Sequence, residues 1–289
     1  MRAGVALMLL GGAGSQAGAG IGAHAFSSLG PAGVVAVRQV VAALVLLPVA
    51  RPPLLRMTWS QWWPALLLAA VFGVMNLSLY TAIDRIGLGL AVTLEFVGPL
   101  AVALLGSRSR TDLLTAAAAG AGVYVLVLLG PSTDFLGVGL ALLAAACWAA
   151  YILLNRTAGT RLPGLQAPAV ATLLTAVAYL PVLWLLASQG RLTGLPLLYA
   201  VSAGVLSSVI PYAADLTALR LVPQRLFGVF MSVHPVLAGL AGLLLLGQVL
   251  DLHEWAGIAL VVLANVAAVA AVRAPGPVAR RATEPQPVG

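Results

Sequence analysis

Ten long apolar runs, separated by short loops, dominate this sequence and restrict the folds that are open to it. The runs cover residues 4–26, 32–50, 62–82, 88–106, 113–130, 135–154, 166–187, 197–218, 224–246 and 254–272. A helix needs about 20 apolar residues to cross the hydrocarbon core of a membrane. Membrane-spanning strands are shorter and alternate apolar with polar residues. The sequence therefore predicts an all-α integral membrane protein with ten transmembrane helices.

The composition agrees with this class and excludes several others. Hydrophobic residues make up 61% of the chain and charged residues 8%, whereas a soluble domain carries about 25% charged residues. The net charge of +7 comes from arginines scattered through short loops, so we expect no nucleic-acid partner. The single cysteine, Cys147, cannot form an intrachain disulfide or a metal cluster. Since common catalytic and phosphate-binding motifs are also missing, we expect no enzyme, no metal and no cofactor.

The arginines divide unequally between the two sides of the predicted membrane. With the N-terminus in the cytoplasm, twelve arginines fall on the cytoplasmic side, only Arg85 and Arg191 fall outside, and Arg38 lies within a span. By the positive-inside rule, both termini are predicted to be cytoplasmic. We interpret the first apolar run as a retained span and not as a signal peptide. The polar, proline-rich segment 274–289 is predicted to be a disordered tail.

An internal repeat connects the two halves of the chain. When the sequence is shifted by 136 positions, residues 81–100 align with residues 217–236. The identities are Thr81 with Thr217, Ala82 with Ala218, Leu90 with Leu226, Val97 with Val233, and Pro99 with Pro235. This alignment predicts two five-helix repeats, 1–131 and 132–273. Because five is odd, the second repeat would be inverted in the membrane, an arrangement typical of secondary transporters with a substrate site near the midplane.

Two ionisable residues lie at a similar depth inside predicted spans. Glu95 is about seven residues into its span and Arg38 about six, both counted from the same side. Ionisable residues within spans are costly and usually functional. We predict that both bind substrate, either as a pair or as two walls of one cavity. A structural ion pair that locks two helices is the alternative.

Prolines lie inside several of the predicted spans, among them the fourth, eighth and ninth. Proline removes one backbone hydrogen bond and perturbs a helix, so we predict hinges at Gly98, Pro99, Pro211 and Pro235. Gly98 would also allow another backbone to approach closely. His234 lies near mid-membrane, where it could bind substrate or pass a proton. A neutral histidine that is hydrogen-bonded to a neighbouring helix is an equal alternative.

Further polar and aromatic residues within the spans complete the predicted substrate-binding set. They are Gln16, Asn76, Tyr80, Trp148, Tyr151, Ser208, Tyr212 and Asp215. For Trp148 and Tyr151 the alternative is packing, and for Asp215 it is hydration near a helix end or pairing with Arg220.

Four stretches carry a resemblance to a known family. They are GVVAVR at 33–38, LEFVGPLAVALLGSR at 94–108, ACWAAYIL at 146–153, and SSVIPYAADLTALRLVPQRLFGVFMSVHP at 207–235. With the ten spans in two repeats, they resemble the EamA-type members of the drug/metabolite transporter superfamily, and within it the bacterial inner-membrane threonine/homoserine exporters. The resemblance covers about residues 5–272. It departs at His234, where the family often has glutamate, and at Asp215, where this branch tends to have glutamate.

The resemblance implies a ten-helix fold in a bacterial inner membrane, with a central cavity lined mostly by the first, third, fourth, sixth, eighth and ninth spans. It also implies export of small neutral amino acids or related metabolites. Arg38 and Glu95 would then bind the carboxylate and the ammonium of a zwitterion. Proton coupling through Glu95, Asp215 or His234 stays an open alternative.

Three other functions are alternatives to amino-acid export. Efflux of toxic cations or drugs would suit the same fold, although Arg38 disfavours a cation. An intramembrane enzyme would need a nucleophile or metal beside Arg38 and Glu95, and a sensor would need a sizeable domain outside the membrane. The expected partners are the lipid bilayer and a small-molecule substrate, and the sequence predicts no oligomeric state.

Overall fold

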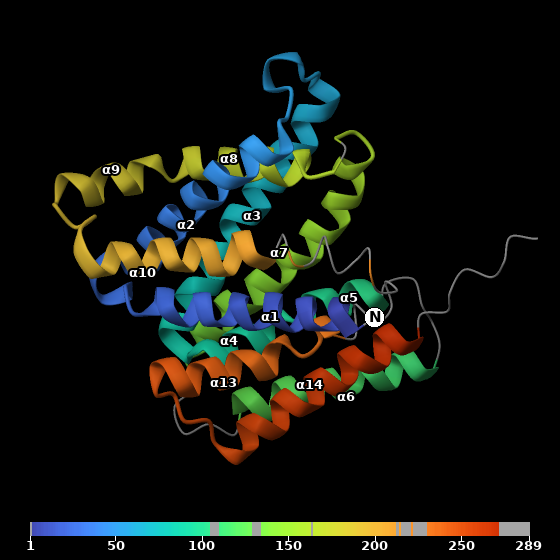
Figure 1. Ribbon diagram of the computed structural model, residues 1–289. Coiled ribbons are helices and arrows are strands. Elements are labelled where there is room, and N and C mark those ends of the chain that lie inside the picture. The colour runs from blue at the N-terminus through green and yellow to red at the C-terminus, as the bar shows by residue number, and fades with distance from the viewer. Residues whose placement is uncertain are drawn as a thin grey trace, which may run out of the picture.

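The computed structural model describes residues 2–104, 110–128, 134–162, 164–211, 214, 221 and 230–271, and every regular element in these residues is a helix. The first half contains α1 (Arg2–Ala23), α2 (Phe26–Ala50), η1 (Leu54–Arg56), α3 (Trp59–Ile86), α4 (Leu88–Glu95), α5 (Val97–Leu104) and α6 (Arg110–Leu128). The second half contains α7 (Phe135–Gly159), α8 (Gln166–Ala178), α9 (Leu180–Ser188), α10 (Gly194–Gly204), the π-helical turn η2 (Val205–Val209), α13 (His234–Leu246) and α14 (Leu252–Ala271) (Figure 1).

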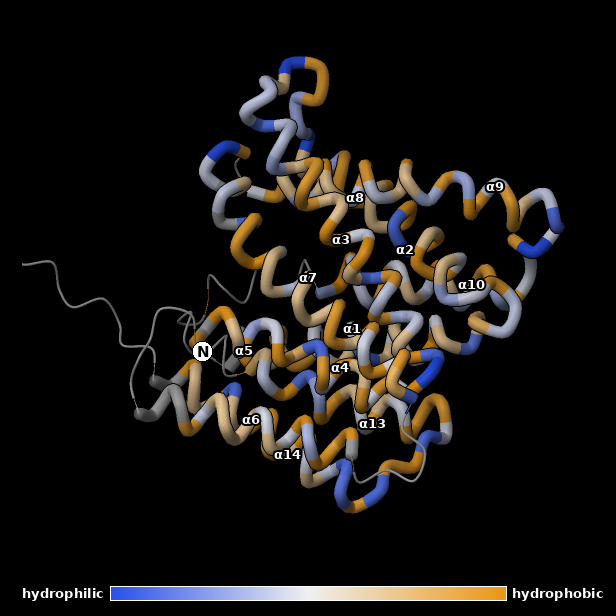
Figure 2. The backbone as a smooth tube through the Cα atoms, turned by 180° about the vertical axis from the view of Figure 1, so that it is seen from behind, coloured by the Kyte–Doolittle hydropathy of each residue, from blue (hydrophilic) through white to orange (hydrophobic). Residues whose placement is uncertain are grey.

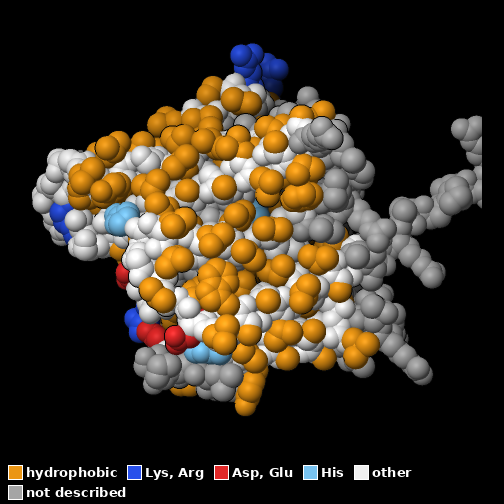
Figure 3. Space-filling model, turned by 60° about the horizontal axis from the view of Figure 1, so that its bottom comes forward, with side chains coloured by type: hydrophobic (Ala, Val, Ile, Leu, Met, Phe, Trp, Pro, Cys, Tyr) orange, Lys and Arg blue, Asp and Glu red, His pale blue; other side chains and the backbone are white. Residues whose placement is uncertain are grey.

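The lengths and hydropathy of these helices confirm a multi-pass membrane protein. In the described part of the chain, five helices are long and apolar enough to cross a membrane: α1, α2, α3, α7 and α14. The pair α8 and α9, bent by 42° at its junction, could form a sixth span, and four further apolar helices are shorter. Hydrophobic residues follow the helices, while the hydrophilic ones lie mainly in connecting segments (Figure 2). The face shown in Figure 3 carries many hydrophobic side chains, and the charged side chains seen on it lie near its edges.

Two helix breaks occur at equivalent positions of the predicted repeats. The helix stops at Glu95, resumes at Val97 and contains Pro99, whose missing N–H would otherwise bond the carbonyl of Glu95. The second break, at 232–233, precedes Pro235 in the same way. Positions 96 and 232 differ by the 136 residues of the sequence repeat. The prolines therefore interrupt both helices as predicted, and their role as hinges stays a prediction.

Contacts between helices also come in equivalent pairs. A shift of 136 residues places α1 on α7, α2 on α8 and α9, and α3 on α10. The packing of α3 on α7 then corresponds to that of α10 on α1, and α3 on α8 corresponds to α10 on α2. Figure 1 shows α10 and α13 on either side of α1. The contacts of α2 with α8 and of α6 with α14 are each their own counterpart.

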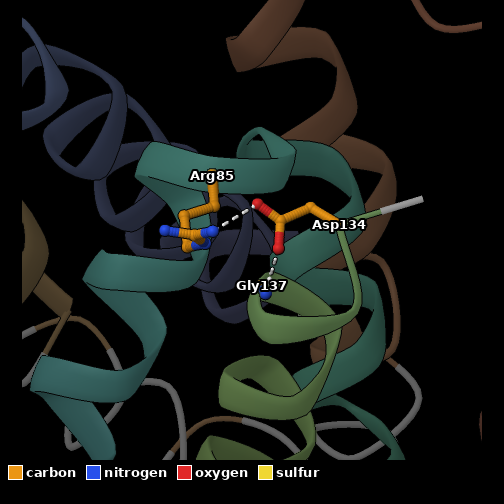
Figure 4. A network of polar contacts seen from close by, with 3 residues as sticks. All are labelled: Arg85, Asp134 and Gly137. Atoms are coloured by element: carbon orange, nitrogen blue, oxygen red, sulfur yellow. Dashed lines mark hydrogen bonds and ion pairs between the residues drawn. The ribbon is translucent and has the colours of Figure 1, made fainter. Parts of the chain in front are cut away.

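Polar contacts between loops define two opposite ends of the bundle. At one end, here termed the Gly87 face, Arg85 Nη2 lies 2.9 Å from Asp134 Oδ2 (Figure 4). There too, the Leu88 N–H donates to Gln248 Oε1 at 3.0 Å, and the Arg191 guanidinium donates to the Ser28 carbonyl. Each of these three contacts joins the first half of the chain to the second.

Asp134 also caps the N-terminus of α7, because its carboxylate accepts the N–H of Gly137 at 2.9 Å. This hydrogen bond lowers the pKa of Asp134 below its ordinary value. Partial desolvation opposes the shift, and the neighbouring Arg85 guanidinium adds to it. The opposite end, the Trp59 face, carries the donation from Gln61 Nε2 to the Arg161 carbonyl at 3.2 Å. Loops from both halves therefore meet at each end of the bundle.

The largest hydrophobic cluster of the described residues lies in the half nearer the Gly87 face, beside a smaller cluster of α6 and α14 around Ile258. The largest cluster joins residues of α1, α2, α3, α4, α7, α9, α10 and α13, among them Val34, Tyr80, Leu88 and Leu94. Towards the Trp59 face lie separate clusters, one of α3, α7 and α8 around Leu68, and another of α5, α6 and α14 around Leu100.

Gly98 allows the close backbone approach that the sequence predicts. A methyl group at Gly98 would overlap the carbonyl of Ala145, so only glycine lets α5 pack this tightly against α7. This contact sets the distance between the broken α4–α5 helix and the helix that carries Trp148 and Tyr151.

Candidate functional site

A cavity of about 190 Å³ lies in the middle of the bundle. Its wall is made by α1, α2, α3, α4, α7, η2 and the start of α13. The lining residues are Ser15, Gln16, Ala19, Arg38, Phe72, Met75, Asn76, Leu79, Tyr80, Val92, Glu95, Phe96, Trp148, Tyr151, Ser207, Pro211, Met231 and His234. Both halves of the chain therefore contribute to one site.

Arg38 reaches this wall from α2 and is held by the second half of the chain. Its Nε donates to Ser208 Oγ at 3.1 Å, and its Nη2 donates to the Ser207 carbonyl at 3.5 Å. The guanidinium carbon also lies 5.1 Å from the centre of the Tyr80 ring, within cation–π range.

The local sequence around Pro211 explains why the Ser207 carbonyl is available to Arg38. In a regular α-helix that carbonyl would accept the N–H of residue 211, but proline has none. The backbone instead widens into the π-helical turn η2, in which the Ile210 N–H bonds the Val205 carbonyl. Turns of this kind often occur at functional sites. The predicted release of a carbonyl by Pro211 is therefore seen in the structure.

Glu95 lies on another wall of the same cavity. It is the last residue of α4, and its side chain is 6% exposed. No ion pair joins it to Arg38 within 4 Å, although both side chains are described. Of the two arrangements considered from the sequence, a direct pair and two walls of one cavity, the structure has the second. Opposite charges thus face a shared space without cancelling each other in a direct contact.

His234 and Gln16 form a polar contact between the two halves. Gln16 Nε2 lies 3.2 Å from His234 Nδ1, which joins α1 to the start of α13. With the amide oriented so that its nitrogen donates, Nδ1 is the acceptor and the imidazole is neutral. The ring also lies near Phe96, tilted by 39° and with 5.6 Å between ring centres. His234 therefore bonds a neighbouring helix and lines the cavity at once.

Aromatic side chains complete the wall. Phe96 meets Trp148 edge to face, with ring centres 4.7 Å apart, and Phe72 lies 5.9 Å from Tyr151. The Tyr80 hydroxyl is buried and has no hydrogen-bond partner among the described residues. The site thus combines one cation, one carboxylate and a few neutral polar groups in a largely aromatic setting.

Most of the predicted substrate-binding residues line the cavity. These are Gln16, Arg38, Asn76, Tyr80, Glu95, Trp148, Tyr151 and His234. Ser208 lies behind the wall, in contact with Arg38, while Tyr212 and Asp215 fall outside the described residues. Within the described part of the chain, no three His, Cys, Asp or Glu residues are grouped as metal ligands would be.

Sequence reasoning missed several lining residues, and only some of them carried a signal. One face of α3 carries Asn76 together with Phe72, Met75 and Leu79 at helical spacing. The polar Asn76 therefore indicated that this face lines the site. Val92 lies one turn before Glu95 in the same way. Ser15 and Met231 gave no such signal, because nothing in their sequence neighbourhood distinguishes them from packing residues.

An apolar helical bundle around a small cavity with polar and ionisable side chains is typical of transporters of small molecules. Residues 135–269 match the EamA-like transporter family. The threonine/homoserine exporter RhtA of Escherichia coli (strain K12) is 33% identical over 272 residues, which cover 93% of this chain and 92% of that protein. RhtA of Salmonella typhimurium is 37% identical over 238 residues, 81% of this chain and 80% of its own. The chain therefore belongs to the EamA-like transporter family, and it is a transporter and not an enzyme.

Two further comparisons agree with this assignment. The uncharacterized transporter YwfM of Bacillus subtilis is 28% identical over 74% of this chain and 76% of its own length. A solved crystal structure superposes with a TM-score of 0.59 at 21% identity, covering 92% of this chain and 96% of that one, which supports the fold alone. The family and the apolar helices together indicate a multi-pass bacterial membrane protein.

We expect water to reach the cavity but not the apolar groove on another face of α3. In a Cys147→Ser background, Met75→Cys should react with a membrane-impermeant thiol reagent, because thiol reactivity needs the hydrated thiolate. Val74→Cys is the matched control. The Val74 side chain is 46% exposed, but it lies in an apolar groove on another face of α3. Labelling is measured by gel shift in membranes, and equal labelling at both positions would contradict an aqueous cavity.

Proposed function

We propose that this protein exports small neutral amino acids such as threonine or homoserine. The observation that carries the proposal is the placement of Arg38 and Glu95 on separate walls of one small cavity. A zwitterion presents a carboxylate and an ammonium, which suit these two groups better than a simple cation or anion would. The identity to the threonine/homoserine exporters over most of the chain supports the same substrate class.

The size of the cavity favours a small metabolite over a drug. Pockets for drug-sized ligands occupy roughly 300–1,000 Å³, whereas this cavity has about 190 Å³. The fixed guanidinium of Arg38 also repels lipophilic cations. Efflux of toxic cations or drugs therefore remains the alternative outcome of the experiments below and is not the function proposed.

The transport mechanism that we propose is alternating access by two inverted five-helix repeats, 1–131 and 132–273. It is supported by the helix breaks 136 residues apart and by the equivalent helix contacts of the two halves. The position of the largest hydrophobic cluster, nearer the Gly87 face, supports a cavity that is closed towards that side. Export would then require the contacts at the Gly87 face, such as Arg85 with Asp134, to separate.

The arginine distribution supports an orientation in which both termini are cytoplasmic and the Gly87 face is periplasmic. A reporter that is active only in the cytoplasm, fused after Arg273, should give a signal. A reporter that is active only in the periplasm should give none at that position but should be active when inserted at Gly190, in the α9–α10 turn. The reverse pattern would contradict this orientation, and the same signal from both positions would contradict the three spans predicted between them.

Export is tested directly in a bacterial host. Expression should raise tolerance to toxic threonine or homoserine and speed the release of labelled amino acid from preloaded cells. Glu95→Gln and Arg38→Ala should each lose most of this gain, because each removes one charge that the zwitterion needs, while the protein stays in the membrane. Glu254→Gln is the control, since it makes the same chemical change at a residue outside the cavity.

Two outcomes would count against amino-acid export. If the Glu95→Gln variant transports amino acids like the parent protein, the carboxylate is not needed for transport. Protection against lipophilic cations without any effect on small amino acids would replace the proposal with drug efflux.

We also propose that His234 makes transport depend on pH. Its imidazole lines the cavity, contacts Gln16 and faces the same space as Glu95 and Arg38. His234→Gln keeps a hydrogen-bonding amide but cannot titrate, so the transport–pH profile should flatten between about pH 5.5 and 8. Initial efflux rates across this range measure the effect. An unchanged profile would remove His234 from proton coupling.

A further inference from the structure

Arg38 is held at three points, and all of them leave one edge of its guanidinium free. Ser208 Oγ accepts from Nε, the Ser207 carbonyl accepts from Nη2, and the Tyr80 ring covers one face. A guanidinium has five N–H donors in a planar fork. Both donors of Nη1 and the second donor of Nη2 have no hydrogen-bond partner among the described residues, and Arg38 lines the cavity. A carboxylate is the group that such a fork binds best.

The π-helical turn presents two consecutive serines to different helices of the first half. Ser207 Oγ donates to the Ser15 carbonyl on α1 at 2.8 Å, whereas Ser208 Oγ accepts from Arg38 on α2 at 3.1 Å. Both serines are buried. The turn thus fastens α1 through one hydroxyl and orients Arg38 through the next, so the two functions can be separated by substitution.

We infer that Ser208 is a positioning residue that aims the free donors of Arg38 into the cavity and thereby makes the site selective for solutes that carry a carboxylate. The inference rests on the proposed function, because it assumes that Arg38 binds the substrate's carboxylate. An arginine side chain has many rotamers, and fixing it costs entropy. The contact between Ser208 and Nε selects the rotamer in which the fork faces the solute before the solute arrives.

The test compares two ligands and three variants of the full-length protein in lipid nanodiscs. The ligands are threonine and the amino alcohol in which a CH2OH group replaces its carboxylate, and calorimetry gives the dissociation constant of each. Ser208→Ala should weaken threonine binding about tenfold or more, as the loss of a hydrogen bond that orients a charged group implies. It should leave binding of the amino alcohol within about twofold, because that ligand does not use the fork.

Ser207→Ala and Ser208→Thr are the matched controls. Ser207→Ala removes a similarly buried hydroxyl from the same turn but keeps the carbonyl that Arg38 uses, so the preference for threonine over the amino alcohol should persist. Ser208→Thr keeps a hydroxyl and should restore the preference. If Ser208→Ala does not fold, Ser208→Cys, which is similar in size but a weak acceptor, carries the same expectation.

The outcomes separate the inference from the proposed function. If the parent protein binds neither threonine nor another small neutral amino acid, the proposed function is wrong and the inference falls with it. If the parent binds threonine and Ser208→Ala binds it equally well, the inference alone is wrong. An equal loss for both ligands, or the same loss of preference in Ser207→Ala, would assign Ser208 a general structural role and also overturn the inference.

Discussion

The structure depends on how a guanidinium and a carboxylate are accommodated inside an apolar helix bundle. Charges in a membrane interior are expensive unless they are paired or face a wet cavity. Arg38 and Glu95 do not pair directly. Arg38 is satisfied by Ser208, by the Ser207 carbonyl and by the Tyr80 ring, while Glu95 faces the cavity from the broken end of α4. The unpaired arrangement keeps both charges available to a solute that carries the opposite pair.

Proline is the means by which this sequence creates polar groups at mid-membrane depth. A regular helix satisfies all of its internal carbonyls and offers nothing to a ligand or a buried cation. Pro211 leaves the Ser207 carbonyl for Arg38, and Pro99 breaks the helix just after Glu95. Pro235 does the same beside His234. Each interruption lies at the cavity, where a neighbouring helix or a bound solute can compensate for the lost backbone bond.

Much of the site could be predicted because residues that line a cavity from one helix recur at helical spacing along its sequence. Glu95, Arg38 and His234 stand out as polar residues within apolar runs, and Asn76 marks the face of α3 that also carries Phe72 and Met75. The partners of these residues could not be predicted in the same way. Gln16 and His234 are 218 positions apart, and Arg38 and Ser208 are 170 apart. No local pattern encodes which of several apolar helices will become neighbours.

The sequence by itself determined the class of the protein, the approximate positions of its apolar helices and the places where prolines break them, because hydropathy and backbone chemistry act locally. Only the tertiary structure decided that Arg38 and Glu95 would line one cavity without forming an ion pair. That outcome depends on the close packing of α5 on α7 at Gly98 and on the turn that holds Arg38. Both are contacts between segments distant in sequence, and their geometry follows from the shapes of the packed helices.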